Sequence, residues 1–92
     1  MNQITKVKST EQTIVNFFGI AVSLPDRYNI ITMDKNGSVY IHSEDSVVRP
    51  LEDSGEWDSQ GSKFASYRAT YSQYVCNVEY EGDWTQFVMV VE

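Results

Sequence analysis

Carboxylates are concentrated in residues 43–58, which read SEDSVVRPLEDSGEWD, and their type and spacing point to a binding chemistry. The segment holds six acids against one base, Arg49, so five of the six net negative charges of the chain lie here. Pro50 and Gly55 interrupt any helical or alternating pattern, which predicts an exposed connection that carries charge outward. The six acids are Glu44, Asp45, Glu52, Asp53, Glu56 and Asp58.

A second acidic group, at the predicted tip of a hairpin, consists of Glu79, Glu81 and Asp83. Alternate residues of a strand lie about 6.8 Å apart on one face, and duplex DNA carries one negative charge per about 1.7 Å of its axis. Carboxylates at comparable spacing can occupy the Lys and Arg rows with which DNA-binding proteins hold phosphates. The two groups form one such surface only if the fold joins them. Otherwise the acids are solvated side chains that aid solubility.

Few groups are available for catalysis or metal binding, because the chain holds one histidine, His42, and one cysteine, Cys76. A Cys–His nucleophile needs both side chains in contact, and the pattern places Cys76 on a core face and His42 in a different hairpin. Zinc sites use about four N or S ligands. The run from Asp34 begins like a calcium loop, but Val39 stands where that motif needs glycine. We therefore predict no catalytic residue, no metal and no cofactor, with a carboxylate pair as the remaining enzymatic alternative.

Composition predicts a single soluble domain, residues 1–92, in the cytoplasm. The aromatic content of 13% is too high for a disordered acidic chain, and a lone cysteine fits a reducing compartment. The first eight residues lack the apolar stretch of a signal peptide, and no run is long enough to span a bilayer. A net charge of −6 disfavours direct contact with nucleic acid or anionic membranes, so partners are expected to be basic.

One helix is predicted in the N-terminal third. Ser9 and Gln12 have the spacing of a capping box, and Gly19 is a suitable stop. A helix here would pack on a sheet through Phe17 or Phe18. Its apolar stripe at one-turn spacing consists of Ile14, Val15, Phe17 and Phe18.

A first hairpin is predicted around Asn36-Gly37, a pair that favours a two-residue type I′ turn. This turn places Met33 opposite Tyr40 on neighbouring strands. The two strands are residues 28–34 and 38–42.

A second hairpin is predicted around Glu81-Gly82, joining residues 72–80 to residues 84–91, after a strand at 63–70. Its core face would hold Tyr74, Cys76, Val78, Thr85, Phe87 and Met89. The predicted fold class is therefore α+β, with one N-terminal helix packed on an antiparallel sheet of four to five strands built from two hairpins.

The chain also resembles a known family of small acidic proteins. Its length, its acidic second half and the run VKSTEQTIVNFFGIAVSLPDRYNIITMDKNGSVYIHSEDSVVRPLEDSGEW are similar to the anti-restriction nuclease (Arn) proteins of T-even bacteriophages. The resemblance implies a phage product that mimics DNA and inhibits a host restriction endonuclease of the McrBC type, with no catalytic residue. The bases Arg49, Lys63 and Arg68 depart from a strong DNA mimic and imply that the mimicry is partial.

Two functions of different classes follow. The first is a DNA mimic whose nine acids occupy the basic DNA-binding surface of a restriction enzyme in an infected host cell. Because a small domain offers only a short line of charge, a homodimer is expected to double its length. The alternative is a non-enzymatic adaptor that binds a protein through an apolar or aromatic patch around Trp57 or Trp84.

Overall fold

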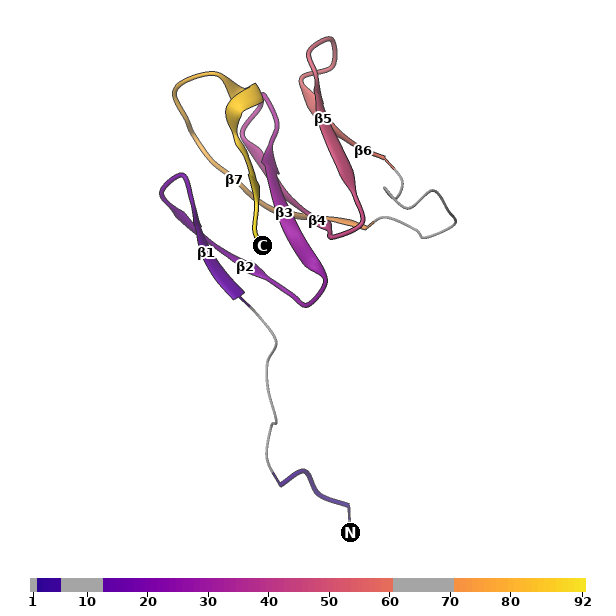
Figure 1. The fold of residues 1–92 in the computed structure, drawn as a ribbon. Coiled ribbons are helices and arrows are strands. Elements are labelled where there is room, and N and C mark those ends of the chain that lie inside the picture. The colour runs from indigo at the N-terminus through magenta and orange to yellow at the C-terminus, as the bar shows by residue number, and fades with distance from the viewer. Residues whose placement is uncertain (1, 6–12, 61–70) are drawn as a thin grey trace.

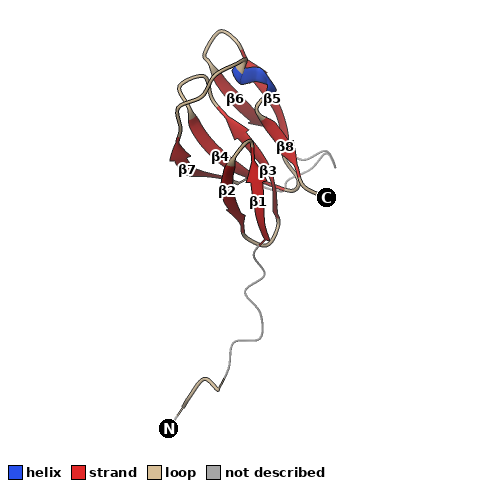
Figure 2. Cartoon of the chain, turned by 90° about the vertical axis from the view of Figure 1, so that its left-hand side faces the viewer, coloured by secondary structure: helices blue, strands red, loops and turns tan. Residues whose placement is uncertain are grey.

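Three antiparallel sheets make up the fold, and the largest lies between two hairpins (Figure 1). The computed structural model describes residues 2–5, 13–60 and 71–92. Its elements are β1 (Thr13–Phe17), β2 (Ile20–Leu24), β3 (Tyr28–Met33), β4 (Ser38–Ser43), β5 (Val47–Leu51), β6 (Glu56–Gln60), β7 (Ser72–Asn77), the 3₁₀ helix η1 (Trp84–Gln86) and β8 (Val88–Val90). The four-stranded sheet has the order β7-β4-β3-β8, whereas β1–β2 and β5–β6 are two-stranded. Figure 2 shows the same strands turned by 90°, with η1 near one end of them.

The predicted N-terminal helix is wrong, and with it the α+β fold class, because the described residues are nearly all β. Residues 13–17 form β1, which pairs with β2 in a hairpin. Three consecutive β-branched residues, Thr13, Ile14 and Val15, favour a strand because a helix restricts their χ1 angles. Local propensity therefore outweighs the apolar stripe that suggested a helix.

A tight turn stands where the helix was expected to stop. Phe18 has a φ of 49° and Gly19 a φ of 106°, which are the two positive angles that a type I′ hairpin turn requires. The Gly19 amide donates to Oδ1 of Asn16 at 2.7 Å. Of the two predicted anchors, Phe17 is 2% exposed and belongs to the core, whereas Phe18 is 57% exposed.

The apolar core lies between the β1–β2 hairpin and one face of the four-stranded sheet. Ile31 and Met33 of β3 are fully buried there, and full burial of such a side chain contributes about 1.5–3 kcal/mol. Along β1 and β2 the buried residues alternate with outward ones, which is the period of a strand. The buried cluster consists of Phe17, Val22, Leu24, Ile31, Met33, Val39 and Ile41.

The predicted hairpin around Asn36-Gly37 is confirmed as β3–β4, but its predicted register is wrong by one residue. Met33 pairs with Val39 rather than with Tyr40. The cause is the length of the loop, which has three residues where the type I′ turn has two.

Hydrogen bonds show how the longer loop forms. The Asp34 amide donates to the Ser38 carbonyl, and the Gly37 amide donates to the Asp34 carbonyl, both at 2.9 Å. Gly37 has a φ of 90°, whereas Asn36 does not have a positive φ. This is a type I turn followed by a left-handed glycine, the usual three-residue hairpin loop.

The predicted second hairpin is wrong, because its two strands lie at opposite edges of one sheet. β7 pairs with β4, and β8 pairs with β3. Between them Trp84–Gln86 form η1 instead of continuing a strand. Of the predicted core face, Cys76, Val78, Phe87 and Met89 pack against the core, whereas Tyr74 is 56% exposed.

The prediction of an irregular connection at residues 43–58 is wrong, because most of these residues form the β5–β6 hairpin. Of its apolar side chains, Trp57 is half-buried, whereas Val47 is 47% exposed. The indole of Trp57 donates to the Met33 carbonyl at 2.9 Å and fixes the hairpin on the sheet face opposite the apolar core. The predicted strand at 63–70 and the capping pair near residue 9 lie outside the described residues.

No helix within the described ranges is long and apolar enough to cross a membrane.

Candidate functional site

Loops from three parts of the chain meet at the β3–β4 turn. The Lys35 amide donates to the Gly55 carbonyl at 2.8 Å, which brings in the β5–β6 turn. The Tyr80 hydroxyl donates to the Lys35 carbonyl at 2.6 Å, and the Val78 amide donates to the Gly37 carbonyl at 2.9 Å. Residues 52–56 and 79–83 therefore lie at the same end of the molecule (Figure 1).

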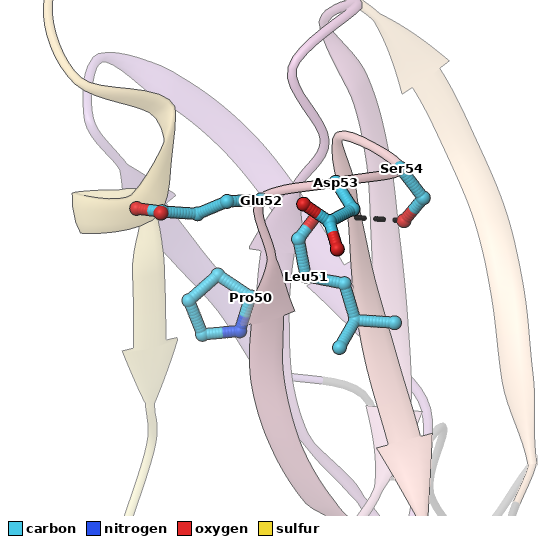
Figure 3. A pocket seen from close by; sticks show the side chains of 5 residues that line it. All are labelled: Pro50, Leu51, Glu52, Asp53 and Ser54. Atoms are coloured by element: carbon cyan, nitrogen blue, oxygen red, sulfur yellow. Dashed lines mark hydrogen bonds between the residues drawn. The ribbon is translucent and has the colours of Figure 1, made fainter.

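Six of the nine predicted binding acids lie at this end, which we call the acidic end. They are Glu52, Asp53, Glu56, Glu79, Glu81 and Asp83, and all are exposed. Within the part of the chain that the structure describes, none of them forms an ion pair. Figure 3 shows the side chains of Glu52 and Asp53 leaving the β5–β6 turn in different directions, with Glu52 extending toward η1. The two acidic groups predicted from sequence therefore meet in part.

The other three predicted acids do not belong to the acidic end. Glu44 and Asp45 lie in the β4–β5 turn, at the far end of β4, where the Glu44 amide donates to the Arg27 carbonyl at 2.8 Å. The six residues of β4 span about 20 Å. Asp58 lies along β6, where Arg49 Nε approaches its Oδ2 at 3.7 Å and partly offsets its charge.

Among the described residues, bases contribute little to the acidic end. Of the bases in the described ranges, Lys35 lies among these carboxylates, Arg49 is next to Asp58, and Arg27 lies in the β2–β3 turn. Counted over the described ranges, six carboxylates against one ammonium group make this end strongly negative, which favours a basic partner.

Asp83 is held as a carboxylate by its neighbours. Its Oδ1 accepts hydrogen bonds from the Thr85 hydroxyl at 2.7 Å and from the Thr85 amide at 3.0 Å, as the N-cap of η1. These two bonds lower the pKa of Asp83 below its ordinary value. Asp83 is thereby both ionised and fixed in direction.

A small polar cavity lies between the four-stranded sheet and the β5–β6 hairpin, and we call it the hairpin pocket. Its volume is about 180 Å³. Asp34 is 7% exposed, and its Oδ1 accepts a hydrogen bond from the Trp57 amide at 2.9 Å. Burial raises the pKa of Asp34, the Trp57 bond lowers it, and the nearby Glu56 raises it. The residues that line the pocket are Thr32, Asp34, Tyr40, His42, Glu56, Trp57, Ser59 and Ser72.

His42 is a structural residue of this polar face. Its Nε2 is 2.8 Å from the Thr32 hydroxyl and its Nδ1 is 2.8 Å from the Ser72 hydroxyl, so both ring nitrogens are engaged. Cys76 of β7 pairs with Val39 of β4 and packs on the apolar face of the sheet. The two side chains thus lie on opposite faces of the sheet and do not form a nucleophile and base. Among the residues that the structure describes, no group of three or more His, Cys, Asp or Glu is arranged to hold a metal ion.

Unfolding of this protein is expected to become easier as the pH falls from 7 to 5. Burial lowers the pKa of His42 from 6.5 to about 4, and the side chain is 3% exposed. The contribution of neutral His42 to the free energy of unfolding is complete above pH 6.5. It is lost as the pH falls toward 4, because His42 binds a proton more tightly in the unfolded chain than in the folded one. The full loss is about 3 kcal/mol, of which about 2 kcal/mol falls between pH 7 and pH 5. Urea unfolding at both pH values measures it.

The variant His42→Gln is the matched control, because it has no titrating group at this position. Its unfolding free energy should be lower than that of the wild type at pH 7 but should change little between pH 7 and pH 5. An equal pH dependence in both proteins would assign the effect to other groups.

Sequence reasoning missed the contribution of Asp34 and Lys35 to this end of the molecule and of Ser59 to the hairpin pocket. Asp34 and Glu56 are 22 positions apart, and no local spacing signals that the β5–β6 hairpin folds back onto the β3–β4 turn. The one available signal was Trp57 between two acids, which marks the point where the hairpin is anchored.

Comparisons of this chain with protein-family models, with curated proteins and with solved structures found no match.

Proposed function

We propose that this protein is a DNA mimic, and that its acidic end enters the basic DNA-binding surface of a nuclease and competes there with duplex DNA. The observation that carries the proposal is the gathering of six exposed carboxylates without ion pairs, within the described ranges, at one end of the fold. A surface of this kind attracts rows of Lys and Arg and needs no chemical step of its own.

The proposal extends to the class of target, a restriction endonuclease, and to the assembly of the protein, a homodimer. The resemblance to anti-restriction nuclease proteins implies a host restriction endonuclease of the McrBC type, met in the cytoplasm of an infected cell. Six charges correspond to about 10 Å of duplex axis, which is about a third of a helical turn. A homodimer that places two acidic ends in line would lengthen the imitated duplex.

An adaptor that binds through a tryptophan patch has less support. Trp57 and Trp84 pack against each other edge to face, with ring centroids 6.3 Å apart, and both are half-buried. The indole nitrogen of Trp57 already donates to the Met33 carbonyl. These contacts give both rings a role inside the fold, where they join β6 to η1.

Binding to the target is expected to weaken about tenfold when NaCl rises from about 50 mM to about 200 mM, because the attraction is between solvent-exposed charges. Direct binding of the purified protein to a McrBC-type endonuclease, measured by calorimetry without DNA, is the suitable assay. DNA is left out because its own affinity for the nuclease falls steeply with salt.

A salt-independent affinity would contradict the DNA-mimic proposal and would favour the adaptor. In that case Trp84→Ala, which removes an aromatic surface and no charge, should weaken binding more than Glu81→Gln does. The DNA-mimic proposal requires the opposite order.

A further inference from the structure

The hairpin pocket has a composition suited to an organic cation. Asp34 and Glu56 supply carboxylates, Tyr40 and Trp57 supply aromatic surface, and Ser59 supplies a hydroxyl. These residues come from β4, from β6 and from the β3–β4 turn, so three elements that the fold brings together build the pocket.

Asp34 lacks a counter-charge among the described residues, although it accepts the Trp57 amide, and Ser59 lacks a hydrogen-bond partner there. Asp34 is 7% exposed, and among the described residues it forms no ion pair, although buried charges in proteins are normally paired. The hydroxyl oxygen of Ser59 is buried and has no hydrogen-bond partner in the described part of the chain, which is uncommon for a buried polar atom. A ligand with a positive charge and N–H donors would supply the counter-charge that Asp34 lacks.

His42 does not oppose a cation in this pocket. With its two ring nitrogens next to the hydroxyls of Thr32 and Ser72 and its pKa lowered to about 4 by burial, it is neutral at pH 7. The local charge therefore comes from Asp34 and Glu56, which repel each other until a cation lies between them.

The volume of the hairpin pocket suits a single functional group rather than a whole small molecule. Sites for drug-sized ligands have volumes of about 300–1,000 Å³, whereas this pocket has about 180 Å³. A guanidinium group is preferred over an ammonium group because it is planar, weakly hydrated, able to bond a carboxylate through two N–H groups and able to stack on aromatic rings.

We infer that the hairpin pocket binds the guanidinium group of an arginine side chain presented by the basic partner of the acidic end. That the arginine belongs to a nuclease rests on the proposed function, whereas the affinity of the pocket for guanidinium does not. The pocket lies beside the acidic end and shares Glu56 with it, so an arginine inserted here would fix the position of the partner while the other five carboxylates attract it.

Titration of the full ¹⁵N-labelled chain with methylguanidinium, well below denaturing concentrations, tests this inference. Saturable shifts are expected at the Trp57 indole and at the amides of Asp34 and Trp57, with a Kd on the order of 1 mM. Methylammonium, which has the same charge, should bind at least about fivefold more weakly because it lacks the planar donor set.

Two matched variants separate the pocket from the general negative field. Glu56→Gln removes a pocket carboxylate and should weaken methylguanidinium binding about tenfold, whereas Glu52→Gln removes an acid outside the pocket and should change it less than about twofold. Non-saturating shifts, equal binding of methylammonium, or equal effects of the two variants would overturn the inference. Because no nuclease is present, a failure here is distinct from a failure of the DNA-mimic proposal.

Discussion

Neutralising all six carboxylates of the acidic end is expected to weaken inhibition of the target nuclease by about 100-fold or more. The variant combines Glu52→Gln, Asp53→Asn, Glu56→Gln, Glu79→Gln, Glu81→Gln and Asp83→Asn. Exposed charge pairs contribute about 0.2–1 kcal/mol each, so six of them at about 0.5–1 kcal/mol each amount to about 3–6 kcal/mol, which is about two to four decades of affinity. The measurement is the concentration of protein that halves cleavage of modified DNA by a McrBC-type endonuclease.

A comparison of two double variants shows whether position or net charge matters. Glu52→Gln with Asp53→Asn removes two charges from the acidic end, whereas Asp26→Asn with Glu44→Gln removes two exposed charges from the opposite end of β4. The first pair should weaken inhibition about tenfold and the second less than about threefold. Equal effects would mean that the target responds to net charge. Unchanged inhibition by the variant with all six substitutions would rule out the acidic end as the binding surface. Circular dichroism and urea unfolding establish that each variant is folded.

Local turn chemistry made part of the fold predictable. Asn36-Gly37 between two β-favouring runs correctly indicated the β3–β4 hairpin, since glycine at a positive φ is a requirement of the backbone. The register was wrong because only Gly37 adopts a positive φ, and a three-residue loop shifts the pairs from Met33 to Ile30 by one position. A dipeptide indicates that the chain turns, but the length of the loop depends on the hydrogen bonds of Asp34 that close it.

The helix and the second hairpin failed for different reasons. In residues 13–17 the apolar residues fit a helical stripe as well as a strand, and the β-branched run with the Phe18-Gly19 turn decided in favour of the strand. For β7 and β8 the strands were largely identified, but their partners were not. Consecutive strands pair often but not always, and here both join the β3–β4 hairpin, one at each edge.

The sequence predicted a set of exposed acids but not which of them lie together at the acidic end. Composition identified all nine acids, and six of them meet because Lys35 bonds to Gly55 and Tyr80. Those bonds involve backbone groups and one hydroxyl, which leave no charge pattern in the sequence. The separation of Glu44 and Asp45 from the rest follows from β5, whose five residues lie between the β4–β5 turn and Glu52.

Gly37→Ala is expected to destabilise the protein by about 3–5 kcal/mol, a large part of the 5–15 kcal/mol typical of a domain. A Cβ at Gly37 would lie 2.1 Å from the Val78 carbonyl oxygen, and φ there is +90°. Relief requires the backbone at Val78 to move, which strains the 2.9 Å bond from the Val78 amide to the Gly37 carbonyl. Overpacking, the backbone conformation and the weakened hydrogen bond each contribute about 1 kcal/mol or more. Thermal unfolding should show a midpoint lower by roughly 15 °C or more.

Gly19→Ala isolates the steric part of that effect. Gly19 has a similar positive φ of +106°, but a Cβ there meets nothing within 4 Å, so the loss should be only about 1 kcal/mol from backbone strain. Equal losses of stability at the two glycines would show that the contact with Val78 is not tight.

The comparison also bears on function, because Val78 leads directly into the acids of residues 79–83. If this contact holds the two halves of the acidic end together, Gly37→Ala should weaken inhibition at temperatures where it is still folded, and Gly19→Ala should not.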